Sequence, residues 1–104
     1  MASSLIKQVM YGDLVSQEFK SAAHTVSAGT VGSIPGGTSE TINVAKTGYT
    51  PIAAHISKNA HATNVLAHVT LTGNTLYLRF VRTSSSAYDM PADDVRVTVL
   101  YKKN

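Results

Sequence analysis

The end of the chain alternates between apolar and polar residues over eight positions. One row is apolar and the other mostly polar: Val95, Val97, Val99 and Tyr101 against Arg96, Thr98, Leu100 and Lys102. Successive side chains of a strand point to opposite faces, so this period of two predicts a strand with one buried face.

Two further alternating runs flank Gly73-Asn74. The expected inward row is Val65, Ala67, Val69, Leu71, Leu76, Leu78 and Phe80, and the outward row is Leu66, His68, Thr70, Thr72, Tyr77, Arg79 and Val81. A Gly-Asn pair between such runs is typical of a two-residue hairpin loop. The sequence therefore predicts a β-hairpin over residues 65–82.

Shorter strands are expected upstream. Phe19–Val26 alternates imperfectly, Glu40–Val44 places Ile42 and Val44 on one face, and Ile52, Ala54 and Ile56 form an inward row. Turns or loops are predicted at Pro35-Gly36-Gly37, at Lys46–Pro51 and over Thr83–Asp94, because Gly, Pro, Asn, Asp and Ser interrupt regular structure.

These segments predict an all-β fold, a small jelly-roll-like antiparallel β-sandwich of six or seven strands over residues 17–104. Residues 1–16 differ, since Leu5, Val9 and Leu14 recur at wider intervals and Gly12 interrupts them. We expect a connector or arm there, either a short helix or an extended segment; a frayed terminus is the alternative.

Length and composition narrow the function classes. The 104 residues fit one domain, and the absence of Cys excludes disulfides and thiolate zinc sites. The net charge is +3, but basic residues cluster only at Arg79/Arg82 and Lys102-Lys103, which argues against nucleic-acid binding. No signal peptide or membrane-spanning run is recognisable, so we expect synthesis in the cytoplasm, without export by a signal peptide and without membrane insertion.

The outward faces are less polar than a solvated sheet requires. Leu66, Tyr77 and Leu100 lie on them, with His68 beside them. Contiguous exposed apolar surface usually marks an interface, which predicts that one sheet is covered by the N-terminal segment or by another subunit of a homo-oligomer that uses these four residues. Coverage by long loops of the same chain is the alternative.

No catalytic or metal-binding motif is present. The histidines His24, His55, His61 and His68 lack ligand spacing, and a cross-strand pair of His55 and His68 would still be two ligands short of a zinc site. Asp89, Asp93 and Asp94 share one loop but offer no pair for glycoside hydrolysis and too few oxygens for calcium. We expect no enzyme activity, no metal and no cofactor.

Saccharide recognition favours an aromatic ring beside donors and acceptors that fix the hydroxyls. Tyr88 with Asp89, and the loop residues Asn59, His61 and Asn64, are the candidates, with Tyr49 as a weaker one.

A family resemblance bears on the same region. Gly48–Asn59, the hairpin Val65–Arg82, the Ser-rich loop and the closing strand resemble the C-terminal domains of bacteriophage tail-fibre and baseplate proteins over about residues 40–104. The resemblance implies a homotrimeric tail component of the virion that binds a host cell-surface saccharide or protein and other virion proteins. An architectural adaptor with protein partners only, and a bacterial β-sandwich binding module unrelated to phage, are the alternatives.

Overall fold

The computed structural model describes residues 4–29, 36–82 and 84–104, and all regular structure in them is β. The nine strands of this part of the chain are β1 (Leu5–Tyr11), β2 (Leu14–Lys20), β3 (His24–Val26), β4 (Gly36–Asn43), β5 (Tyr49–Asn59), β6 (Leu66–Thr72), β7 (Thr75–Arg82), β8 (Tyr88–Met90) and β9 (Val95–Lys103). The predicted all-β antiparallel class is confirmed, but the predicted strand number is too low. The described residues contain no helix long and apolar enough to cross a membrane.

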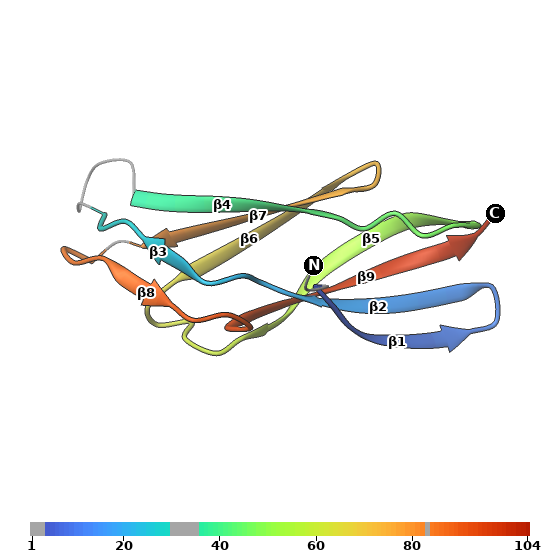
Figure 1. The fold of residues 1–104 in the computed structure, drawn as a ribbon, viewed down its shortest axis with the longest axis horizontal. Helices are drawn as coiled ribbons and strands as arrows, with labels where there is room; N and C mark the ends of the chain where they lie inside the picture. The colour runs from blue at the N-terminus through green and yellow to red at the C-terminus, as the bar shows by residue number, and fades with distance from the viewer. Residues whose placement is uncertain (1–3, 30–35, 83) are drawn as a thin grey trace.

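The strands divide among a four-stranded sheet (β1-β2-β9-β5), a three-stranded sheet (β4-β7-β6) and a two-stranded ribbon (β3-β8), and every named pair is antiparallel. Figure 1 shows an elongated molecule, with β4-β7-β6 and the ribbon towards one end and the four-stranded sheet towards the other. Its extents are 47 × 24 × 23 Å.

The alternation of apolar and polar residues in the sequence correctly predicted which side chains of β7 and β9 belong to the core. The complete apolar row of β9 is buried, as are Leu76, Leu78 and Phe80 of β7 and the expected pair Ile42 and Val44. The inward row of β6 is half-buried against this cluster. Burial of these side chains is the main term that holds the sheets together.

Two sequence predictions are wrong in detail, and a third lies partly outside the described residues. Ile52 was expected inward but is half exposed, because a bulge between Pro51 and Ala53 shifts the register of β5. Val81 was expected outward and exposed, yet it is buried. The turn predicted at Pro35-Gly36-Gly37 lies partly outside the described residues, and its two glycines begin β4.

Residues 5–16 are extended rather than helical. They form β1 and the first part of β2, joined by a turn in which Gly12 has φ of 60°. The expected boundary between residues 16 and 17 falls inside β2, whose Val15, Gln17 and Phe19 are buried beside β9. The period of two was hidden because Gly12 divides the segment and β1 carries a bulge.

Tyr101 ties β9 to the segment that follows β4. Its side chain is fully buried, and its hydroxyl donates a hydrogen bond of 2.5 Å to the carbonyl oxygen of Val44. Burial raises the pKa of Tyr101 to about 12, because the phenolate would lose its hydration.

We expect Tyr101→Phe to lower the free energy of unfolding by about 1 to 3 kcal/mol, since it leaves the Val44 carbonyl without this partner and changes little else. Denaturant unfolding at pH 7 measures the loss. Tyr11→Phe, at an exposed tyrosine, is the matched control and should stay within about 0.5 kcal/mol of the parent. Equal stability of both variants would contradict the role assigned to the Tyr101 hydroxyl.

The same pair of proteins gives a pH prediction. The pKa of Tyr101 lies above its ordinary value of 10.0, so its contribution to stability is complete below pH 10 and is lost as the pH rises towards 12. The stability deficit of Tyr101→Phe should therefore narrow over that window. A deficit that stays constant from pH 9 to pH 12 would show that Tyr101 ionises equally in the folded and unfolded chains.

Candidate functional site

A histidine and a tyrosine contact one carboxylate beside the loop that joins β5 to β6. The His61 Nδ1 lies 2.7 Å from Asp94 Oδ1, and the Tyr88 hydroxyl donates to Asp94 Oδ2 at 3.5 Å. Asp94 is buried, so both of its oxygens need partners. His61 and Tyr88 supply them and are held in place in return.

The loop carrying His61 is folded onto the residues before β9. The backbone N–H groups of Asn64 and Val65 donate to the His61 carbonyl, and the N–H of Ala60 donates to the Asp94 carbonyl. Within this loop the Asn59 side-chain amide donates to the Val65 carbonyl at 3.0 Å. Backbone contacts therefore fix the position of the His61 ring.

Arg82 also lies beside Tyr88. Its Nη1 donates to the Asn64 carbonyl at 2.8 Å and its Nε to the Ser86 carbonyl at 2.6 Å. The guanidinium carbon lies 5.5 Å from the centroid of the Tyr88 ring, and the His61 ring centroid lies 5.8 Å from it, tilted by 56°. A cation and an imidazole thus both lie near one half-buried aromatic ring.

We call His61, Asn64, Arg82, Tyr88 and Asp94 the corner cluster. Partial burial and the neighbouring Asp94 carboxylate raise the pKa of Tyr88, while Asn64 and Arg82 act in the opposite direction. The Tyr88 hydroxyl is therefore protonated at neutral pH and acts as a hydrogen-bond donor. The cluster combines a ring face, fixed donors and one cation, a combination suited to binding a polar ligand.

The structure brings together three of the five predicted ligand-binding residues: Tyr88, His61 and Asn64. Asp89 points to the opposite side of β8, where its Oδ1 accepts a hydrogen bond from Thr25. Asn59 has a structural contact, and its Oδ1 is buried without a partner among the described residues. Sequence reasoning did not identify Arg82 and Asp94 as members of the corner cluster. The only signal for them in the sequence was their position, at the end of β7 and at the end of the long loop before β9.

The four predicted interface residues do not form one surface. Leu66, His68 and Tyr77 share the outer face of β4-β7-β6, where Leu66 and Tyr77 are 55% and 50% exposed. Leu100 lies half-buried in the other large sheet. The cross-strand pair of His55 and His68 is not formed, because β5 and β6 belong to different sheets.

The acidic residues of the long loop have separate partners. Asp89 contacts Thr25, Asp94 contacts His61, and Asp93 forms a bidentate pair with Arg96 at 2.7 and 2.8 Å. Their carboxylates are therefore not gathered into one site. The part of the chain that the structure describes has no group of three residues able to hold a metal ion.

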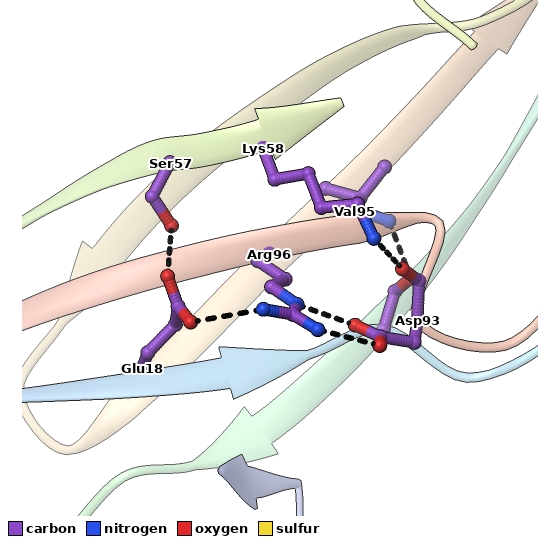
Figure 2. Close-up of polar contacts among 7 residues, drawn as sticks. Glu18, Ser57, Lys58, Asp93, Val95 and Arg96 are labelled. Atoms are coloured by element: carbon purple, nitrogen blue, oxygen red, sulfur yellow. Dashed lines mark hydrogen bonds and ion pairs between the residues drawn. The ribbon is translucent and has the colours of Figure 1, made fainter. Parts of the chain in front are cut away.

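The Asp93–Arg96 pair belongs to a structural network that connects three strands (Figure 2). Arg96 Nη1 also lies 3.4 Å from Glu18 of β2, and Glu18 accepts a hydrogen bond from Ser57 of β5. Lys58 donates a hydrogen bond to the Asp93 carbonyl. Asp93, which has a φ of 65°, is therefore held through its backbone and its side chain together. The charged groups of the network pair with one another. The network therefore has a structural role, which is to hold β2, β5 and β9 together.

Comparison of the chain with protein-family models, with curated proteins and with solved structures gave no match. The resemblance to phage tail domains therefore stays a prediction.

The network has a pH dependence that can be measured. The hydrogen-bonded Arg96 lowers the pKa of Asp93 from 3.8 to about 2. The stability from Asp93 should be complete above pH 4 and should be lost as the pH falls towards 2. Asp93→Asn preserves the positive φ, which Asn tolerates, and should be less stable than the parent above pH 4, with a gap that closes as the pH falls through 2. Urea unfolding across this range measures the gap, and Arg96→Gln should reproduce its pH profile. A gap that does not change with pH would contradict the assignment.

Proposed function

We propose that this protein is a non-catalytic tail component of a bacteriophage virion and that its corner cluster binds a host cell-surface saccharide. One observation carries the proposal: the Tyr88 ring lies beside both His61, with ring centroids 5.8 Å apart, and the Arg82 guanidinium carbon, 5.5 Å from the ring centroid, within a hydrogen-bonded frame. An aromatic face contacts the C–H groups of a sugar ring, and polar side chains beside it select the hydroxyls.

The donors of the cluster are ordered before any ligand arrives. His61 is about half exposed, and its Nδ1 is engaged with Asp94, which leaves Nε2 as the ring nitrogen for a ligand. Arg82 is held by the two carbonyl oxygens of Asn64 and Ser86. Side chains that are fixed in advance lose less entropy on binding, so even a shallow site gains affinity.

Repeated copies would strengthen a weak site of this kind. Several copies on one particle act together and bind a surface more tightly than one copy does. A homo-oligomer in the virion tail, as the resemblance implies, suits a small saccharide site for this reason. Its trimeric state remains a prediction that the mass in solution tests.

A second candidate function is purely architectural, with other virion proteins as partners. The exposed Leu66 and Tyr77 on the outer face of β4-β7-β6 favour it, because large apolar side chains at about half exposure are common in protein interfaces. In that case the corner cluster would only stabilise the fold.

Binding to a glycan panel and to isolated bacterial cell wall separates the two functions. His61→Gln removes the imidazole but retains an amide that can donate to Asp94, so the fold should survive. We expect this variant to bind the saccharide about tenfold more weakly, because it loses one hydrogen bond and the contact of the imidazole ring. The matched control is His55→Gln, an exposed histidine on β5, which should bind like the parent.

Tyr88→Leu removes the ring and should abolish binding, whereas Tyr88→Phe should retain most of it. Circular dichroism and thermal unfolding of each variant check that the fold is intact. Saccharide binding that is unchanged in folded His61→Gln and Tyr88→Leu would overturn the assignment of the corner cluster. The absence of any binding by the parent, together with co-assembly with tail proteins, would favour the architectural function.

A further inference from the structure

The two edges of the four-stranded sheet are built differently. At the β5 edge, Pro51 lacks an N–H and two bulges interrupt the register, between Pro51 and Ala53 and between Ile56 and Lys58. These are devices that prevent an edge strand from pairing with another chain. At the β1 edge the pairing with β2 is regular from Lys7 to Tyr11, and this run contains neither Pro nor a bulge.

The run Lys7–Tyr11 is also unusually apolar for an exposed edge. Met10 is 56% exposed and Tyr11 is 60% exposed, and Lys7 is the one charged residue of the run. Figure 1 shows β1 at the margin of the sheet, on the far side of β2 from β9. A regular, apolar edge with a single charge is the kind that accepts a further strand.

The backbone of this run is oriented for such pairing. Two residues separate the paired Tyr11 and Leu14, so the hairpin loop is closed by this pair, whose backbone groups face each other. Orientation alternates along an antiparallel strand. The backbone groups of Val9 therefore face β2, and those of Gln8 and Met10 face outward.

We propose that two copies of this chain associate through β1, antiparallel, about a two-fold axis at Val9. The regular run is bounded by the bulge before Lys7 and by the turn after Tyr11, and Val9 is its midpoint. Only this register uses the whole run in both copies. It pairs the outward backbone groups of Gln8 in one copy with those of Met10 in the other.

The side chains agree with this register. Lys7 lies opposite Tyr11 of the second copy rather than opposite a second lysine, so like charges do not meet. Val9 lies opposite its own counterpart, and Met10 lies opposite Gln8. A register shifted to centre on Lys7 would place two lysines face to face, which is unfavourable.

The pairing joins two four-stranded sheets into one continuous sheet across the copies. It is a closed, isologous contact and gives a dimer. A trimer, if present, would need a different surface, and the inference does not depend on the saccharide proposal.

A single cysteine tests the register directly, because the chain has none of its own. Residues opposite each other at a non-hydrogen-bonded position are about 4.5 Å apart between Cα atoms, within the range that a disulfide spans. Val9→Cys should therefore form a covalent dimer under mild oxidation, visible on a non-reducing gel. The matched control is Tyr11→Cys, on the same strand and face but more exposed, which should stay monomeric because its counterpart lies four residues away along the strand.

Cross-linking of Val9→Cys that is no faster than that of Tyr11→Cys would overturn the proposal. A second measurement does not use cysteine. Met10→Pro, made in the chain without an added cysteine, removes an outward N–H from each copy. In sedimentation equilibrium this variant should self-associate about tenfold or more weakly than the parent. A parent chain that stays monomeric at millimolar concentration, or a folded Met10→Pro variant with undiminished self-association, would also exclude this interface.

Discussion

Burial of one complete face of β9 is the constraint on which the molecule depends. Val95, Val97, Val99 and Tyr101 have no exposed surface, and the strand pairs with β2 on one side and β5 on the other. Tyr101 adds a hydrogen bond to the Val44 carbonyl, which fixes the chain between β4 and β5 against the sheet. Because a strand has only two faces, this burial also determines which residues remain on the surface.

The polar clusters are positioned by the same strand. Asp94 directly precedes the first buried valine of β9 and holds His61 and Tyr88, while Arg96 lies on the opposite face and holds Asp93 and Glu18. The charged groups of these two clusters each have a partner, as their desolvation requires. The corner cluster is therefore rigid because it is attached to the most deeply buried element, and a rigid frame is what a small binding site needs.

The edges of the four-stranded sheet have contrasting surfaces. Bulges and a proline make β5 a poor template for another strand, whereas β1 offers a regular apolar run. The outer face of β4-β7-β6 adds a separate apolar surface at Leu66 and Tyr77. The proposed saccharide site and the proposed self-association edge use different residues, so the two proposals are compatible within one assembly.

The sequence alone determined the fold class and the core rows of β7 and β9, because alternation with a period of two follows directly from strand geometry. It was misleading at Ile52, where a bulge shifts the register. Over residues 5–16 it left a short helix and an extended segment open, because Gly12 divides two short strands. It also named Tyr88, His61 and Asn64 as candidates from residue type. Only the tertiary structure showed that Arg82 and Asp94 complete the cluster while Asp89 and Asn59 contact other groups, because contacts between residues far apart in the chain depend on how sheets pack and leave no local pattern.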